Sequence, residues 1–341
     1  MLWLTAYAIG LAAFCNESTR AKRLHDISSS LEVGYDDWLW SEQLSGGGLT
    51  IQALRFLVGV LGSDFFRDEV DVTISKRSDV LLASKLPEIH YIYSFPYGYQ
   101  MSDDDVQILR QLKKLHTIHM GRSVITSKGA AALSEIPSLE WLDLDSDLVS
   151  DDAGIGLAKS RSLRNLRMRN CDVGDQFVRN ITALSELHTL EISRAGISDE
   201  GINCLPRFRK LSRLFLDHTC VGDESATTFH RLESLEELSL RGTCITDKGA
   251  ALISRCTRLR KLDLRETSVS DKGIASLADL TLLEDVLLDD TDITDAGLRT
   301  LERFPSLKTV HLSSRGVSSM ALQRLKQRPE LMVFIDNTWP L

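Results

Sequence analysis

One leucine recurs every 24 residues along most of this 341-residue chain. The positions are Leu115, Leu139, Leu163, Leu187, Leu211, Leu235, Leu259, Leu283, Leu307 and Leu331. Columns three and five residues after each leucine hold Ile, Leu, Met or Val until Phe334 and Asp336 in the last unit. A fixed internal period of about 20 to 50 residues indicates stacked repeats, because each unit can bury its apolar side chains only against its neighbours.

The spacing inside each unit predicts its structure. The alternation L-x-L has a period of two, which predicts a short strand with one buried face. The rest of a unit, such as DAGLRTLERF (295–304), has apolar residues about three apart, which predicts a short helix or 3₁₀ segment. Stacked units would place parallel strands about 4.8 Å apart, and strand–helix–strand crossovers of this kind are right-handed.

An aspartate occupies one column of the repeat. It is present as Asp151, Asp175, Asp199, Asp223, Asp247, Asp271 and Asp295, with Ser127 and Ser319 in register. Asp and Ser both cap helix N-termini, so this column is predicted to cap the helix of its own unit. A glycine two residues on, as in Gly249 and Gly273, is expected where a neighbouring coil leaves no room for a side chain. A ladder of calcium ligands is disfavoured, because each unit supplies only one carboxylate.

A second polar column follows each first leucine by eight residues. It contains Ser123, Asp147, Cys171, Ala195, Thr219, Thr243, Thr267 and Thr291. Its hydroxyls are predicted to bind loop backbone, and Cys171 in this column is predicted to be structural. Cys220 and Cys244 share a register in adjacent units, which leaves a disulfide open. The chain contains no C-x-x-C pair, so the sequence suggests neither a zinc site nor thioredoxin-like chemistry.

The pattern LxxLxLxxTxITDxGLxxLxxLxx, over about residues 101–337, resembles the leucine-rich-repeat proteins abundant in planctomycete-type bacteria. It is more distantly similar to the repeats of F-box leucine-rich proteins. The resemblance implies an α/β fold, a right-handed leucine-rich-repeat solenoid or horseshoe. In such a solenoid a parallel β-sheet lines the concave face and short helices cover the convex face. Upstream, LEVGYDD (31–37) and LGSDFFRDEVDVTIS (61–75) resemble the segment that joins a membrane helix to the repeats in those bacterial proteins.

Three segments are expected along the chain: an apolar membrane anchor at 1–15, a linker and N-terminal cap at 16–69, and the solenoid with its C-terminal cap at 70–341. The apolar run at 2–15 is shorter than the roughly 20 residues of a spanning helix. A buried element in a cytoplasmic protein therefore stays open as the alternative to single-pass anchoring. The stretch 49–62 is predicted to be a helix over the open end of the core, and 70–75 and 89–94 are predicted to be the first strands.

Charge and motifs exclude several functions. The net charge of −8 lacks the basic footprint of a nucleic-acid-binding protein. No G-x-S-x-G, H-E-x-x-H or P-loop motif is present. The sequence therefore predicts no catalytic, cofactor-binding or metal-binding residue, and a monomer that is not an enzyme.

The exposed positions of the strands form two further columns. One contains Asp145, Arg169, Ser193, Asp217, Arg241, Arg265 and Asp289, and the other contains His119, Asp143, Arg167, Glu191, Phe215, Ser239, Asp263, Leu287 and His311. Opposite charges on neighbouring strands can simply neutralise one another. They can equally form a binding face, since arginine and aromatic side chains are common in interface hot spots.

The binding reading assigns eight concave-face residues to a protein partner. They are Trp141, Arg167, Arg169, Arg213, Phe215, Arg241, Arg265 and Leu287. The predicted function is a non-enzymatic protein–protein interaction scaffold. The alternative is a substrate-receptor subunit of a ubiquitin ligase, as F-box leucine-rich proteins are, although residues 16–69 contain no recognisable F-box.

Overall fold

The computed structural model describes residues 49–50, 70–86, 89–94 and 98–335. Within them, 13 strands form one sheet in which spatial order follows sequence order. The strands are β1 Leu49–Thr50, β2 Val70–Ile74, β3 Ile89–Ser94, β4 Thr117–Met120, β5 Trp141–Asp145, β6 Asn165–Arg169, β7 Thr189–Ser193, β8 Arg213–Phe215, β9 Glu237–Ser239, β10 Lys261–Asp263, β11 Asp285–Leu288, β12 Thr309–Leu312 and β13 Met332–Ile335. Every neighbouring pair is parallel, so each unit adds one strand to the growing edge.

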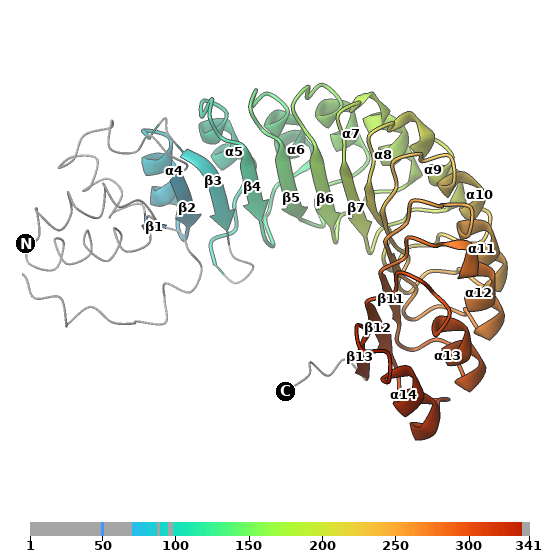
Figure 1. Cartoon of the computed structure of the whole chain (residues 1–341). Helices are drawn as coiled ribbons and strands as arrows, with labels where there is room; N and C mark the ends of the chain where they lie inside the picture. Colours follow the sequence, from blue (N-terminus) through green and yellow to red (C-terminus); the bar gives the residue numbers. More distant parts are fainter. Residues whose placement is uncertain (1–48, 51–69, 87–88, 95–97, 336–341) are drawn as a thin grey trace, which may run out of the picture.

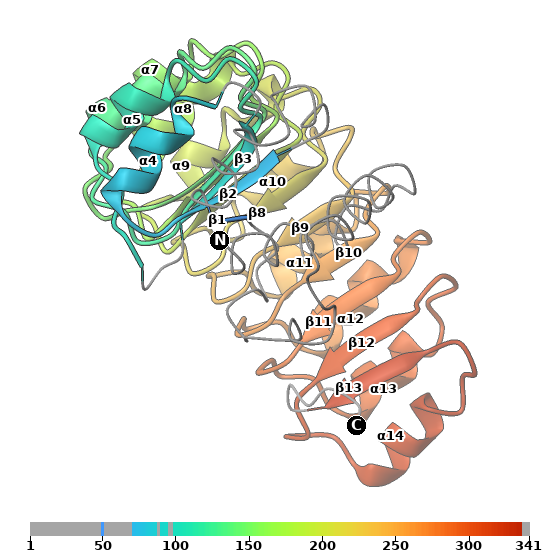
Figure 2. The ribbon, with the colours of Figure 1, turned by 90° about the vertical axis from the view of Figure 1, so that its left-hand side faces the viewer.

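From β2 onward, a short helix returns the chain from each strand to the next. The helices are α4 Arg77–Ala83, α5 Asp103–Leu109, α6 Ser127–Leu133, α7 Asp152–Leu157, α8 Asp175–Asn180, α9 Asp199–Ile202, α10 Ala226–Phe229, α11 Asp247–Ile253, α12 Asp271–Ser276, α13 Asp295–Leu301 and α14 Ser319–Leu325. The sheet lines the inner side of an arc, and the helices lie on its outer side (Figure 1). Seen from the side, the later coils swing away from the earlier ones, so the arc twists as well as bends (Figure 2).

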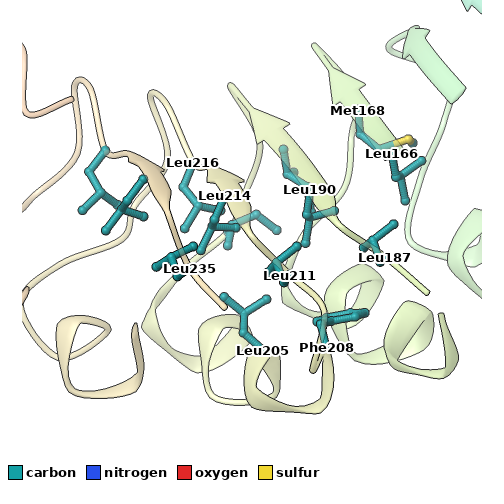
Figure 3. Packing of buried hydrophobic residues seen from close by; sticks show 14 of the residues in the cluster. Leu166, Met168, Leu187, Leu190, Leu205, Phe208, Leu211, Leu214, Leu216 and Leu235 are labelled. Carbon is teal, nitrogen blue, oxygen red and sulfur yellow. The ribbon is translucent and has the colours of Figure 1, made fainter. Parts of the chain in front are cut away.

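The 24-residue period is confirmed as the register of the sheet. Between β4 and β12, each residue lies opposite the residue 24 positions later, as Leu142 lies opposite Leu166 and Leu166 opposite Leu190. The ten leucines of the first column are all buried, and the most exposed of them, Leu331, is only 7% exposed. Figure 3 shows Leu187, Leu211 and Leu235 following one another through the core. Each buried leucine contributes about 1.5–3 kcal/mol, so the stacked column is the main source of stability.

The sequence predicted that each aspartate of the column caps the helix of its own unit, but the structure shows otherwise. Asp247 is the first helical residue of α11, and Thr246 is the N-cap, its hydroxyl accepting from the Lys248 N–H. The Asp247 carboxylate instead reaches the next coil. It accepts from the backbone N–H of Ser270 at 2.7 Å, from the Ser270 hydroxyl at 2.7 Å and from the Gly273 N–H at 3.0 Å. That prediction is therefore wrong: the aspartate serves the helix start of the following unit.

The same relay, which we call the aspartate ladder, joins most successive coils. Its members are Asp103, Asp151, Asp175, Asp199, Asp223, Asp247, Asp271 and Asp295. The ladder explains the glycine column, because a Cβ on Gly273 would stand 2.7 Å from an Asp247 carboxylate oxygen, and one on Gly249 would stand 2.5 Å from an Asp223 oxygen. The expected lack of room beside a neighbouring coil is confirmed.

The threonine column behaves as predicted. The hydroxyls of Thr219, Thr267 and Thr291 each donate to the carbonyl three residues earlier at 2.6 Å, which closes the turn after the strand. Cys171 is 4% exposed in the same column, and burial raises the pKa of its thiol to about 12. A thiol with so high a pKa is unreactive, which agrees with a structural role. Cys220 and Cys244 are exposed free cysteines and form no disulfide.

The two ends of the sheet depart from the regular period. Leu49 and Thr50 pair with β2 as a strand, so the helix predicted for 49–62 is wrong at these two residues, and the rest of that stretch lies outside the described residues. At the other end, β12 pairs with β13 one residue out of period, with Val310 opposite Val333. The strict period would have turned Phe334 and Asp336 into the core, and burying an unpaired aspartate is costly.

The strands predicted at 70–75 and 89–94 are confirmed as β2 and β3. Among the described residues, no helix combines the length and apolar character needed to span a membrane. The proposed anchor at 2–15 lies outside those residues.

Candidate functional site

The eight residues predicted to bind a partner fall into two groups on the concave side. Trp141, Arg167 and Arg169 belong to β5 and β6. Arg213, Phe215, Arg241, Arg265 and Leu287 belong to β8, β11 and the segments that directly follow β9 and β10. The structure therefore separates the predicted site into an N-terminal and a C-terminal part of one sheet.

The N-terminal group is an aromatic and cationic stack. The guanidinium of Arg167 lies 4.9 Å from the centre of the Trp141 ring, and its Nε is 3.0 Å from a Glu191 carboxylate oxygen. His119 stacks on Tyr93 with 5.0 Å between ring centres and lies 5.9 Å from Trp141. These contacts hold the side chains in place, so the group forms a preformed surface with little side-chain freedom left to lose.

Asp143 binds two side chains of this N-terminal group, Arg169 and His119. It is 4% exposed, receives Arg169 Nη2 at 2.7 and 2.8 Å on its two oxygens, and lies 3.1 Å from His119 Nδ1. Burial opposes ionisation of Asp143, but the hydrogen bonds from His119 and Arg169 outweigh it and hold the pKa of the carboxyl below its usual value. The neutralising charge ladder expected at Asp143 and Arg169 is therefore present.

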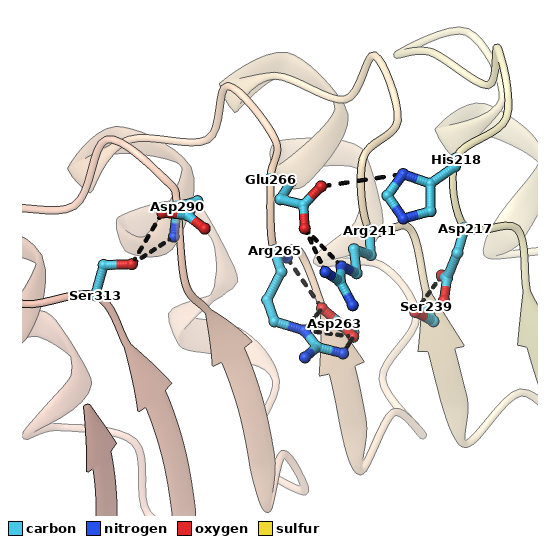
Figure 4. Close-up of polar contacts among 9 residues, drawn as sticks. All are labelled: Asp217, His218, Ser239, Arg241, Asp263, Arg265, Glu266, Asp290 and Ser313. Carbon is cyan, nitrogen blue, oxygen red and sulfur yellow. Dashed lines mark hydrogen bonds and ion pairs between the residues drawn. The ribbon is translucent and has the colours of Figure 1, made fainter. Parts of the chain in front are cut away.

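The arginines of the C-terminal group also have carboxylate partners within the chain (Figure 4). Arg241 Nε donates to Glu266 at 2.8 Å, and Arg265 donates to both oxygens of Asp263, with Nη2 at 2.6 Å. The guanidinium forks of Arg241 and Arg265 are thus already occupied. Arg213 has no ion pair among the described residues, and its Nη2 is 3.4 Å from the side-chain oxygen of Asn165.

A groove opens over β8 to β12, beside these ion pairs. Its volume is about 360 Å³. It is lined by Phe215, Asp217, Glu237, Leu238, Ser239, Lys261, Leu262, Asp263, Arg265, Asp285, Leu287, Thr309 and His311. Phe215 and Leu287 provide apolar walls three strands apart, and both are predicted site residues that the structure brings to one feature. We call this the concave groove.

Three carboxylates in and beside the concave groove have no cationic partner at ion-pair distance among the described residues: Asp217, Glu237 and Asp289. The Asp217 carboxylate accepts from the Ser239 hydroxyl and from backbone at Arg241, and both donors are uncharged. Burial raises the pKa of Asp217, although the bond from Ser239 opposes that shift. The sequence reasoning placed Asp217 and Asp289 in exposed columns but did not assign them to the site.

Asp289 is the least satisfied of the three. It is 2% exposed, and neither of its carboxylate oxygens has a hydrogen-bond partner in the described part of the chain. It lies one residue past the end of β11 and two residues after Leu287, a spacing that points both side chains to the same side of the chain. Burial raises the pKa of the Asp289 carboxyl, and the nearby His311 and Arg265 side chains oppose that shift only in part. A buried carboxylate without donors is a cost to folding that the rest of the coil must offset.

Replacing Asp289 with asparagine is therefore expected to stabilise the protein at neutral pH by about 1–2 kcal/mol, because it removes a buried unpaired charge. The raised folded-state pKa means that the penalty is present above that pKa and disappears once the carboxyl is protonated in both states. The gain should therefore vanish at acidic pH. Urea unfolding at the two pH values measures it, with the adjacent, exposed Asp290→Asn as control. A loss of stability at neutral pH would contradict the assignment.

A second groove, of about 480 Å³, lies at the N-terminal ends of strands β6 to β10 and shares Glu237 and Lys261 with the concave groove. It is lined by Glu140, Arg164, Asn165, His188, Ser212, Arg213, Glu236, Glu237, Arg260 and Lys261. Its charges alternate and largely pair with each other or with adjacent coils: Arg164 is 3.9 Å from Glu140, and Lys261 is 3.4 Å from Asp285. Its walls hold no large apolar side chain, so it offers a weaker site than the concave groove.

Among the described residues, no three His, Cys, Asp or Glu side chains gather in a way that could hold a metal ion. His218 lies 4.0 Å from Glu266.

Comparison with known proteins identifies the architecture. A family model described as "Leucine Rich repeat" matches residues 231–254 and 255–278, two consecutive units. The crystal structure of an internalin (inlF) from Listeria monocytogenes superposes with a TM-score of 0.50 and 18% sequence identity, covering 82% of this chain and 89% of that one. The chain is a leucine-rich-repeat solenoid. At this identity the likeness concerns the fold of the solenoid alone.

Two further similarities carry no argument about the solenoid's function. An internalin C2 (inlC2) structure from the same organism reaches a TM-score of 0.45 at 20% identity, covering 62% of this chain and 84% of that one. Subunit 1 of cytochrome bo(3) ubiquinol oxidase from Buchnera aphidicola subsp. Baizongia pistaciae (strain Bp) is 30% identical over 99 residues, which is 25% of this chain. The match spans only 15% of the length of that oxidase subunit.

Proposed function

We propose that the solenoid is a non-enzymatic scaffold that binds another protein on its concave face. The observation that carries the proposal is the concave groove, in which Phe215 and Leu287 form two apolar walls on an open sheet surface. Stacked parallel strands make an extended concave surface of the kind that repeat proteins use for binding. An aromatic anchor beside a polar rim is the composition of an interaction hot spot.

The N-terminal aromatic and cationic stack would extend the same binding face. From β5 to β11 the sheet advances by six strands, or roughly 29 Å at the usual spacing. A partner that touched both Trp141 and Leu287 would therefore follow the arc over about that length. The arginines support the face mainly as paired, fixed side chains, because Arg169, Arg241 and Arg265 already hold carboxylates of this chain.

The substrate-receptor alternative would use this face in the same way. It requires an F-box, and the sequence of residues 16–69 contains none that is recognisable, so the simple scaffold is favoured. Membrane association through residues 2–15 and a monomeric state remain parts of the proposal that rest on the sequence.

Removing both apolar walls tests the proposal. The double substitution Phe215→Ala with Leu287→Ala is expected to weaken capture of the physiological partner at least tenfold, since loss of a hot-spot residue costs about 2 kcal/mol or more. Full-length protein would be used to retrieve partners from its native cells, with quantitative mass spectrometry comparing the variants.

The matched control removes two exposed apolar side chains from the convex helices, through Leu81→Ala with Ile155→Ala. These side chains are 48% and 58% exposed. The control should retrieve the same proteins as the unaltered chain. If the convex variant loses the partner and the concave variant keeps it, the concave face is not the binding site.

A further inference from the structure

We infer that the concave groove takes a lysine or arginine side chain of a partner segment, flanked by an apolar residue that packs between Phe215 and Leu287. This inference rests on the proposed function and specifies the chemistry of its partner. It assigns the positive charge to the partner, whereas the site predicted from the sequence relies on arginines of this chain.

The arginines around the groove form ion pairs with carboxylates of this chain. In the sheet register, Arg241 and Arg265 stand between Asp217 and Asp289 and would neutralise them. Both arginines turn away, however: Arg241 pairs with Glu266 and Arg265 with Asp263. The turn at Glu266, where φ is 56°, places its carboxylate within reach of Arg241. The two guanidinium groups therefore form their ion pairs with Glu266 and Asp263 and not with Asp217 or Asp289.

The rim of the groove at the start of β9 and β10 carries Glu237 and Lys261. Lys261 pairs with Asp285 at 3.4 Å. Arg213 lies opposite Glu237 in the register but directs its guanidinium towards Asn165, on the side away from Glu237. Glu237 therefore lines the groove without an ion pair among the described residues.

The carboxylate of Asp289 is buried beside the groove. The residue is 2% exposed, and neither carboxylate oxygen has a hydrogen-bond partner among the described residues. Asp289 lies near Arg265 and His311, which both line the groove. A negative charge in such surroundings is poorly screened by water, so it acts strongly on a cation in the groove. With Asp217 and Glu237 it gives three carboxylates that form no ion pair among the described residues, next to two apolar walls.

This combination fits one kind of occupant. A lysine or arginine has an apolar stem that can lie against Phe215 and a cationic end that can reach Asp217 and Glu237. Arginine can also stack on the aromatic face. Carboxylates repel nucleic acid, and an acidic peptide would meet the same repulsion. A basic residue next to an apolar one in an extended segment of a partner satisfies both parts of the groove.

Selection from a random dodecapeptide display library on the immobilised full-length protein tests the inference. Enriched peptides should carry Lys or Arg beside an apolar residue. A synthetic copy of the strongest peptide should bind the double variant Asp217→Asn with Glu237→Gln about tenfold more weakly or worse, the usual effect of losing charged hydrogen bonds. The control Glu224→Gln with Glu233→Gln makes the same charge change on exposed convex positions and should leave the affinity unchanged. Circular dichroism would verify that every variant is folded.

A charge-deleted peptide completes the test. Replacing the basic residue by norleucine should weaken binding to the unaltered protein, with little further loss in the Asn/Gln variant, because both changes remove the same interaction. Peptides that require Phe215 and Leu287 but contain no basic residue would overturn this inference and leave the proposed function standing. Peptides that ignore Phe215 and Leu287, or no enrichment at all, would count against the concave face itself. Self-association that the Asn/Gln variant abolishes would identify a second copy as the occupant and also overturn the inference.

Discussion

Replacing Phe208 with alanine is expected to cost about 3–5 kcal/mol of unfolding free energy, because the ring is 1% exposed and its removal leaves a cavity. Phe208 lies with Leu187, Leu205 and Leu211 where the core of two coils meets (Figure 3). In a solenoid each coil contacts only its neighbours, so a cavity here cannot be offset from elsewhere in the chain. Urea unfolding followed by far-ultraviolet circular dichroism measures the loss.

Phe215 provides the matched control, since it undergoes the same chemical change seven residues later, in the strand of the next unit. Its ring faces the concave groove and is only half-buried. Phe215→Ala should cost below about 1 kcal/mol, as is usual for substitutions outside the core. Equal losses for the two variants would mean that Phe215 is a core residue and not an available binding side chain.

The second large effect is expected from the aspartate ladder. Asp247→Ala removes an acceptor that serves three donors of the next coil, Ser270 N–H, Ser270 hydroxyl and Gly273 N–H. Losing a charged acceptor at a helix start costs about 2–3 kcal/mol. Asp292→Ala is the control, because Asp292 is an exposed aspartate in a nearby coil whose carboxylate has no hydrogen-bond or ion-pair partner among the described residues. A loss no greater than that of the control would show that the ladder is unimportant for stability.

Acid provides an independent check on Asp247. Burial disfavours its ionised form, but the hydrogen bonds from Ser270 and Gly273 outweigh burial and lower the pKa of the carboxyl. A lowered folded-state pKa means that its stabilisation is complete above the usual aspartate pKa and is lost as the pH falls through the folded-state value. The stability difference between the unaltered protein and Asp247→Ala should therefore shrink in strong acid. A difference that stayed constant through that range would exclude the carboxylate charge as its cause.

The arrangement of the coils could be predicted from the sequence because it depends on one strong period. Leu142, Leu166 and Leu190 can enter a common core only if every unit makes a full turn in 24 residues, and the register follows directly. The shift at β13 could not be foreseen from that period. It depends on which alternate residues the last strand buries, and Val333 with Ile335 suits the core better than Phe334 with Asp336.

The direction of the aspartate ladder was beyond sequence reasoning for a different cause. Thr246 and Asp247 are both good capping residues, and neighbouring positions cannot be separated by capping preference alone. The fact that Asp247 is used by the next coil depends on the distance between coils, which only the folded structure sets.

The electrostatics of the concave groove were also hidden in the sequence. In the column of exposed strand positions, the charges of Arg241 and Arg265 balance those of Asp217 and Asp289, so the sequence predicts a neutral face. The balance fails because Glu266, in a turn with positive φ, binds Arg241, while Arg265 folds back on Asp263. The pairing of these side chains depends on the geometry of the turns. The excess of negative charge beside the concave groove can therefore be recognised only in the folded structure.

The aspartate ladder has one orientation along the whole solenoid: each carboxylate belongs to one coil and its donors to the coil that follows in the chain. A ribosome releases a protein from its N-terminus, and N-terminal segments fold first. The acceptor for the helix start around Ser270 therefore belongs to a coil that leaves the ribosome earlier, the coil of Asp247. Wherever the ladder is present, its polarity matches the polarity of synthesis, so a newly made coil would meet an edge that already carries its acceptor.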